Sequence, residues 1–157
     1  MRKFIASSLL FLIFTVSAQE AFQDKRSYVT HAINGLEVPE IDGRFNEPLW
    51  DKVAWEGNFV EADPDENTAP AQSTQFKLVY DDNFLYVAIQ CLDSLPDQIV
   101  KRLSRRDNTQ GDWVAIAFDS YFDKRTAFVF TVSASGVKGD AFATENGNNG
   151  DDSWNPI

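Results

Sequence analysis

The fold is decided by residues 74–92, TQFKLVYDDNFLYVAIQCL. Apolar and polar residues alternate on both sides of Asp81-Asp82-Asn83, which is the period of a β-strand with one apolar face. The acidic and amide side chains between the two runs are typical of a tight turn. We therefore predict a β-hairpin, with Phe76, Leu78 and Tyr80 on the apolar face of its first strand and Gln75 and Lys77 on the opposite face.

The same alternation predicts further short strands on either side of this hairpin. They are expected at 28–33, 113–119, 126–133 and 137–142. Helical patterns are confined to a short segment after Asn46, which is the expected N-cap, and to 96–102. Short strands joined by local turns, with few helices, predict an all-β fold, an antiparallel β-sandwich.

Two local features complete this outline. Residues 145–152 are almost wholly Asn, Gly and Asp, which predicts a loop. Cys91 is the single cysteine, so no internal disulfide is expected. Its place in an apolar strand pattern predicts a buried thiol.

The N-terminus has the pattern of a secretory signal peptide, residues 1–18. Arg2 and Lys3 precede an apolar run of about 11 residues, whereas a membrane span needs about 20. We expect cleavage between Ala18 and Gln19, a flexible leader at 19–27 and one domain over 28–157. The protein is therefore expected to be exported, to the periplasm, the outer membrane or the medium. Because the chain stops directly after the 145–152 loop, we further expect the sandwich to be truncated.

Composition narrows the function. The net charge of −10 argues against nucleic acid and anionic lipid as partners. The only histidine, His31, has no serine motif with which to form a triad, and no zinc or phosphate-loop spacing occurs. We predict no catalytic residue in this region.

Three motifs resemble family 9 carbohydrate-binding modules. The first is IDGRFNEPLW at 41–50, the second is LVYDDNFLYV at 78–87, and the third is DWVAIAFD at 112–119. A related form of the module, at the N-terminus of Gram-negative outer-membrane proteins of unknown role, resembles this chain in Arg106-Asp107, Asp112-Trp113-Val114 and Asp151-Asp152-Ser153-Trp154. The resemblance implies an exported, non-catalytic domain that binds polysaccharide or oligosaccharide.

A sugar site needs an exposed aromatic ring for the C–H face and polar side chains for the hydroxyl groups. Trp113 alternates away from its apolar strand neighbours, and Trp154 follows a polar loop. Arg106, Asp107 and Asp112 lie near Trp113 in the sequence and supply the polar groups. The competing interpretation is structural: both tryptophans would pack in the interior, and the charged residues would form a solvated loop.

Two other functions remain open. Sugar-binding members of family 9 carry Trp and Glu where this chain has Thr109 and Ala115, so the domain could instead be an interaction domain of an outer-membrane β-barrel protein. It could also be the N-terminal part of a glycoside hydrolase whose active site lies elsewhere. Three acidic residues toward the end of the chain, Asp140, Asp151 and Asp152, are candidates for a structural calcium site, since calcium takes oxygen ligands.

Overall fold

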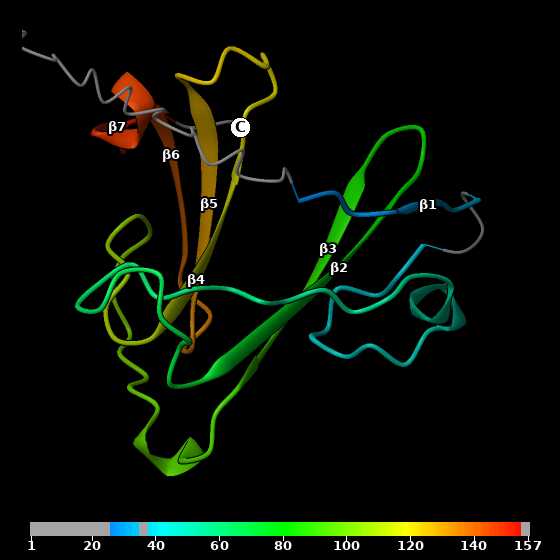
Figure 1. Cartoon of the computed structure of the whole chain (residues 1–157), viewed down its shortest axis with the longest axis horizontal. Helices are drawn as coiled ribbons and strands as arrows, with labels where there is room; N and C mark the ends of the chain where they lie inside the picture. Colours follow the sequence, from blue (N-terminus) through cyan, green and yellow to red (C-terminus); the bar gives the residue numbers. More distant parts are fainter. Residues whose placement is uncertain (1–25, 35–37, 155–157) are drawn as a thin grey trace, which may run out of the picture. The chain divides into compact units, whose positions relative to one another are not determined.

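A computed structural model describes residues 26–34 and 38–154, and it confirms the all-β class. The signal peptide, its cleavage position and most of the leader lie outside the described residues. Within the described part, no helix is long and apolar enough to cross a membrane. The elements shown in Figure 1 are β1 (His31–Ala32), η1 (Pro48–Lys52), β2 (Ser73–Tyr80), β3 (Leu85–Leu92), η2 (Pro96–Gln98), β4 (Trp113–Phe118), β5 (Ala127–Ser133), β6 (Lys138–Thr144), η3 (Glu145–Gly147) and β7 (Asn149–Asp151).

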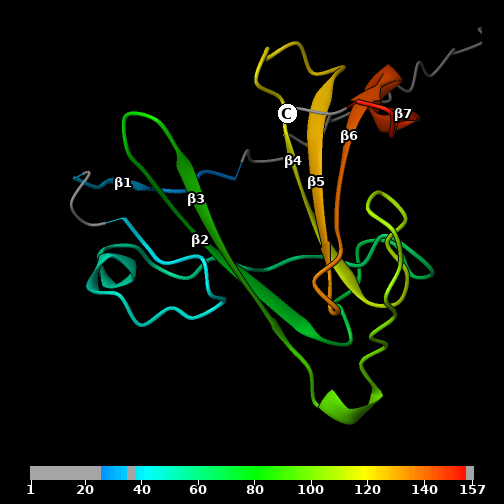
Figure 2. The same ribbon diagram turned by 180° about the vertical axis from the view of Figure 1, so that it is seen from behind.

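Four strands form an antiparallel meander in the order β4-β5-β6-β7 (Figure 2). Trp113 lies opposite Ser133 on β5, and Phe130 lies opposite Asp140 on β6. The turn from β4 to β5 is held by Asp123, whose Oδ1 accepts hydrogen bonds from the backbone N–H groups of Arg125 and Thr126, each at 2.8 Å. These bonds lower the pKa of the Asp123 carboxyl. The antiparallel arrangement predicted from the sequence is confirmed for this sheet.

The other sheet has the order β1-β2-β3, and here the antiparallel prediction is wrong for one pair. β1 runs parallel to β2, with His31 opposite Val79. β2 and β3 run antiparallel because a short turn between two paired strands reverses the direction of the chain. The long connection between β1 and β2 imposes no such limit, so the chain can return in either direction.

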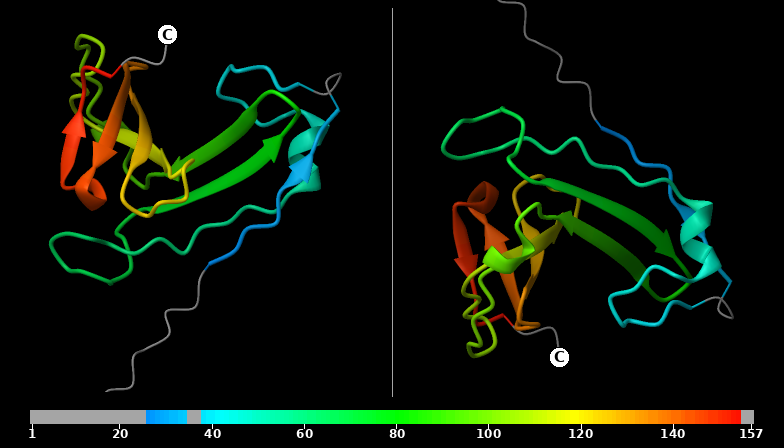
Figure 3. Two further views of the ribbon diagram at one scale, coloured as in Figure 1. Left: turned by 90° about the horizontal axis from the view of Figure 1, so that it is seen from above. Right: turned by 90° about the horizontal axis from the view of Figure 1, so that it is seen from below.

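The chain divides into two compact units. The first combines the segment up to Glu56 with Lys77–Val87, and the second combines Gly57–Phe76 with the chain from Ala88 onward. β2 and β3 therefore each contribute residues to both units. The candidate site lies wholly in the second unit, whose strands β5, β6 and β7 lie side by side in both views of Figure 3.

In the first unit, η1 brings an apolar surface into the interior. Leu49, Trp50 and Val53 are buried, and Val79 is fully buried. The predicted cap is wrong: Glu47, not Asn46, is the N-cap residue, and no side chain caps the helix. Pro48 explains the start, because a proline at the first helical position loses no hydrogen bond.

The predicted orientation of β2 is also wrong. Lys77 and Val79 are buried, whereas Tyr80 is exposed. Lys77 can be buried because its Nζ donates a hydrogen bond of 2.6 Å to the carbonyl oxygen of Trp50. The same ammonium lies 4.9 Å from the centroid of the Trp55 ring, which gives a cation–π contact. Both partners are distant in sequence, so strand alternation alone gives no sign of them.

Replacing Lys77 with alanine is expected to destabilise the protein by about 2–3 kcal/mol, since the charged hydrogen bond and the packing of the side-chain stem are both lost. Lys77→Met keeps the stem and is expected to lose less. The measurement is urea denaturation, with Lys101→Met as an exposed control. A Lys77→Met variant as stable as the wild type would show that the ammonium contributes no net stability.

Three further predictions need correction. Residues 145–152 are not only a loop, because β7 pairs with β6, with Asn149 opposite Thr144. Glu145 and Asn146 both adopt positive φ, which reverses the chain tightly enough for this pairing. Cys91 is exposed rather than buried. It lies at the end of β3, where Leu92 is exposed as well. The second helix, η2, ends at Gln98 and is shorter than predicted.

Candidate functional site

The loop that carries the candidate site is closed at its base by paired backbone. The N–H of Asp112 donates to the carbonyl of Val100 at 3.1 Å, and Lys101 forms an antiparallel bridge with Gly111. In return, the N–H of Val100 donates to Oδ2 of Asp112 at 2.8 Å. Asp112 therefore closes the loop, and one of its two carboxylate oxygens accepts a hydrogen bond from the backbone.

Asp107 attaches the tip of this loop to the outer edge of β6. Its N–H donates to the carbonyl of Lys138 at 3.2 Å, and its Oδ1 accepts from the N–H of Asp140 at 3.1 Å. Gly139 permits the approach, because a Cβ there would lie 3.4 Å from the Cα of Asp107 and would overlap Oγ1 of Thr131. Asp107 thus satisfies two backbone groups of β6 as a neighbouring strand would.

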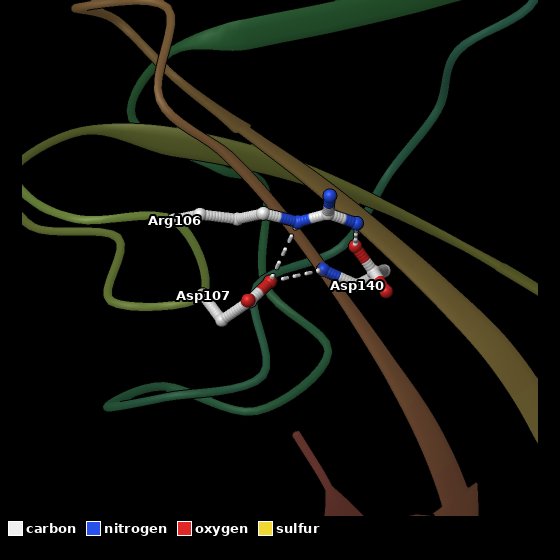
Figure 4. A network of polar contacts seen from close by, with 3 residues as sticks. All are labelled: Arg106, Asp107 and Asp140. Atoms are coloured by element: carbon white, nitrogen blue, oxygen red, sulfur yellow. Dashed lines mark hydrogen bonds and ion pairs between the residues drawn. The ribbon is translucent and has the colours of Figure 1, made fainter. Parts of the chain in front are cut away.

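Arg106 spans the two carboxylates (Figure 4). Its Nη2 donates to Oδ1 of Asp140, and its Nε lies 3.6 Å from Oδ1 of Asp107. The side chain of Asp140 is only 6% exposed, whereas that of Arg106 is 53% exposed. The hydrogen bond and the charge of Asp140 raise the pKa of the Arg106 guanidinium above its ordinary value. Arg106 is therefore a permanent cation that is half exposed and pairs with a buried carboxylate.

A hollow of about 630 Å³ opens beside this ion pair, a size typical of small-molecule sites. Two of the residues that line it each hold a buried polar atom, Oδ2 of Asp140 and Oγ of Ser104, with no hydrogen-bond partner among the described residues. Such atoms are costly unless a ligand or water satisfies them. We call this hollow the Asp140 pocket; it is lined by Ser104, Arg106, Phe130, Thr131, Val132, Val137, Lys138, Gly139 and Asp140.

The apolar wall of the Asp140 pocket is supported by Trp154. The centroid of the Trp154 ring lies 4.8 Å from the centroid of the Phe128 ring. It lies 6.2 Å from the centroid of the Phe130 ring, which it meets edge to face. Phe130 remains 38% exposed and lines the pocket. The turn before Trp154 is held by Asp151, whose Oδ1 accepts from both the N–H and the Oγ of Ser153. These bonds lower the pKa of the Asp151 carboxyl. Trp154 therefore packs on two aromatic rings.

The residues predicted from the sequence are divided between two hollows. Arg106 and Asp107 lie together, joined by Asp140. Trp113 and Asp112 line a second hollow of about 260 Å³, which we call the Trp113 hollow. Trp113 is 57% exposed, and no aromatic ring of the described chain packs against it. The full lining of the Trp113 hollow is Cys91, Asp93, Ile99, Asp112, Trp113, Val114, Val132, Ser133 and Ala134.

The three calcium candidates do not assemble into a site. Asp140 pairs with Arg106, and Asp151 accepts hydrogen bonds from Ser153. Across residues 26–34 and 38–154, no three His, Cys, Asp or Glu side chains are grouped closely enough to hold a metal ion. Asp152 joins no such group.

Sequence reasoning missed Ser104, Phe130 and Lys138 as residues that line the Asp140 pocket, and it gave Asp140 only as a candidate calcium ligand. One signal was available. Asp140 shares a strand face with Phe142, so it places a carboxylate on an otherwise aromatic surface. A carboxylate in such a position requires a cationic or hydrogen-bonding partner. Arg106 supplies one from the preceding loop.

Comparisons with protein-family models, with curated proteins and with solved structures find no match for this chain.

Proposed function

We propose that this chain is a non-catalytic carbohydrate-binding domain and that it binds sugar in the Asp140 pocket. The observation that carries the proposal is that Asp140 and Ser104, each with a buried polar atom that has no hydrogen-bond partner among the described residues, both line a hollow with an exposed aromatic wall. A sugar offers both an apolar C–H face and a rim of hydroxyl groups. It therefore matches this combination of surfaces.

The polar side of the pocket matches hydroxyl chemistry. A carboxylate oxygen only accepts hydrogen bonds, whereas a serine hydroxyl can donate or accept. A sugar hydroxyl can donate to Oδ2 of Asp140 while a neighbouring hydroxyl bonds to Oγ of Ser104. Arg106 and Lys138, which also line the pocket, balance the charges of Asp107 and Asp140. A locally neutral site favours a neutral ligand.

The apolar side matches the ring of a sugar. Phe130 and Val132 alternate onto the same face of β5, and both are partly exposed. The contact of Trp154 with Phe130 fixes this wall. Burial of a C–H face on a rigid ring loses little conformational entropy, which favours binding.

The sequence motifs extend this function to the type of domain and its location. The domain would be an antiparallel β-sandwich of the family 9 carbohydrate-binding type, exported and attached to polysaccharide. Both carboxylates of the site are held by Arg106, and Asp107 also accepts from the backbone. Carboxylates fixed in this way suit ligand binding better than the acid–base roles of glycoside hydrolysis.

A second candidate, an interaction domain, is favoured by the outer edge of β4. The strand WVAIAF contains neither charge nor proline, the features that usually prevent edge strands from pairing. Its hydrogen-bond register directs the N–H and C=O groups of Trp113, Ala115 and Ala117 away from β5. These groups have no backbone partner among the described residues. The domain would then bind a β-strand of another protein, which would pair with the free edge of β4.

The experiment that tests sugar binding is calorimetric titration with neutral β-linked xylo- and cello-oligosaccharides. Dissociation constants of about 1 μM to 1 mM are expected. Asp140→Asn is expected to weaken binding about 10- to 100-fold, because a charge-assisted hydrogen bond is lost. Asp97→Asn, on the exposed helix η2, is the matched control and is expected to bind as the wild type does.

Equal affinity in wild type and Asp140→Asn would contradict the proposal, as would the absence of binding in a broad neutral-sugar screen. If no sugar binds and the protein instead self-associates or captures a β-strand peptide, the second candidate is supported. Circular dichroism and thermal melting of each variant separate a loss of binding from a loss of folding.

A further inference from the structure

The aromatic wall of the Asp140 pocket continues along one face of the β4-β5-β6-β7 sheet. Residues that lie directly opposite each other in an antiparallel pair point to the same face. Phe130 lies opposite Asp140, and Phe128 lies opposite Phe142. Because Phe128 and Phe130 are two residues apart on β5, all four side chains project from one face.

Ring contacts extend this face away from the pocket. Trp154 packs on both Phe128 and Phe130. Beyond them, the centroid of the Tyr121 ring lies 5.9 Å from the centroid of the Phe128 ring. Tyr121 belongs to the connection between β4 and β5, which lies at the opposite end of the sheet from the turn between β5 and β6 (Figure 1). We call Phe130, Trp154, Phe128 and Tyr121 the aromatic strip.

The aromatic strip is open at both ends and is longer than one sugar ring. Phe130 is 38% exposed at the pocket, and Tyr121 is 69% exposed at the other end. Trp154 and Phe128, which lie between them, are partly exposed. Phe128 and Phe130 are about 7 Å apart along β5, and Tyr121 lies beyond Phe128. A single ring bound in the Asp140 pocket therefore leaves the far end of the strip uncovered.

Charged side chains on the same face indicate what covers the aromatic strip. Lys138 lies opposite Val132, and Asp151 lies opposite Phe142. Both charged residues are exposed. A protein layer packed over this face would remove these charges from water, which is costly unless each charge is paired. A sugar chain carries hydroxyl groups along its length, so it can cover the rings while the charges keep hydrogen-bonding partners.

From this arrangement we propose that the ligand is an oligosaccharide that begins in the Asp140 pocket and lies along the aromatic strip as far as Tyr121. The inference rests on the proposed function. One ring of the sugar chain stacks on Phe130, and a later ring of the same chain stacks on Tyr121. Affinity then increases with chain length until Tyr121 is covered, and becomes constant beyond that length.

The test is calorimetric titration of mono- to hexasaccharides of the series that binds best. Wild-type affinity is expected to rise about tenfold or more from the monosaccharide to the tri- or tetrasaccharide. Tyr121→Ala is expected to remove most of this rise, whereas Tyr121→Phe keeps the ring and is expected to retain it. Phe122→Ala is the matched control, because it removes a neighbouring ring that is 77% exposed and lies outside the aromatic strip.

The outcomes separate the inference from the proposed function. If no sugar binds, both fail. If a monosaccharide binds through Asp140 and longer chains bind no better, only the inference fails. The same holds if the gain with length survives Tyr121→Ala or is lost equally in Phe122→Ala.

Two further measurements complete the test. Because Tyr121 is exposed, its replacement is expected to leave the melting temperature nearly unchanged, which shows that the variant is folded. Sedimentation of the wild type and of Tyr121→Ala tests a protein occupant of the same face. A wild-type dimer that Tyr121→Ala dissociates would show that a second copy covers the aromatic strip, and the inference would be wrong.

Discussion

Replacing Gly111 with alanine is expected to destabilise the protein by about 3 kcal/mol or more. Gly111 has a φ of +81°, a conformation that costs an alanine energy in any surroundings. A Cβ at this position would also overlap the carbonyl oxygen of Val100 and lie 3.0 Å from its carbonyl carbon. Both atoms are backbone, so no side-chain rotation relieves the contact. The paired backbone at the base of the Arg106 loop would have to separate.

Gly136 provides a matched control for this substitution. Its φ is also +81°, but nothing lies within 4 Å of a Cβ built on it. Gly136→Ala is therefore expected to cost only the left-handed backbone term, about 1 kcal/mol. Urea denaturation of both variants gives the difference. Equal losses of stability would show that the contact with Val100 is relieved and that the base of the loop is not rigid.

The Gly111→Ala variant also tests how the loop serves the site. Arg106 and Asp107 lie between the two paired segments, so an opened base releases both from Asp140. Sugar affinity is expected to fall in parallel with stability. A destabilised variant that retains full affinity would indicate that the Asp140 pocket does not depend on the loop.

The parts of the fold that were predicted correctly are those fixed by local sequence. The hairpin formed by β2 and β3 has alternation on both sides and an Asp-rich turn, in which Oδ1 of Asp81 accepts the N–H groups of Asn83 and Phe84 at 2.7 Å. These bonds lower the pKa of the Asp81 carboxyl. β4 and β5 were placed to within one residue for the same reason. Such signals need no information from distant residues.

The parts that were missed depend on partners far apart in the sequence. Lys77 is buried through Trp50, which lies 27 residues earlier. The parallel pairing of β1 with β2 joins segments separated by a long connection. Strand alternation cannot reveal either contact, because it reports only which residues share a face. The polar face predicted for β2 was wrong for this reason.

The candidate site divides in the same way. Arg106 and Asp107 were found because charged residues adjacent to a strand in sequence are a local signal. Asp140 was given to calcium, because its true partner, Arg106, lies 34 residues earlier. Asp112, predicted together with them, accepts a hydrogen bond from the backbone of Val100 and lines the Trp113 hollow instead of the Asp140 pocket. The contact of Arg106 and Asp107 with β6 depends on the fold of the intervening loop, which strand alternation does not report.

The ion pair between Arg106 and Asp140 is expected to respond unequally to the loss of each partner. Arg106→Ala leaves the Asp140 carboxylate, 6% exposed, without its cation. An unpaired buried charge is strongly destabilising. Asp140→Ala instead leaves Arg106, whose side chain is already half exposed and can turn toward water. The melting temperature is therefore expected to fall by several degrees in Arg106→Ala and by clearly less in Asp140→Ala.

The double variant decides whether this asymmetry has the stated cause. Arg106→Ala combined with Asp140→Ala removes the unpaired carboxylate, so it is expected to recover most of the stability lost in Arg106→Ala alone. Arg106→Lys keeps the positive charge without the planar guanidinium, and an intermediate melting temperature is expected. Thermal melts of the four variants at neutral pH provide the comparison. Simple addition of the two single losses would mean that the residues act independently, and Asp140 would then not depend on Arg106 for its place in the pocket.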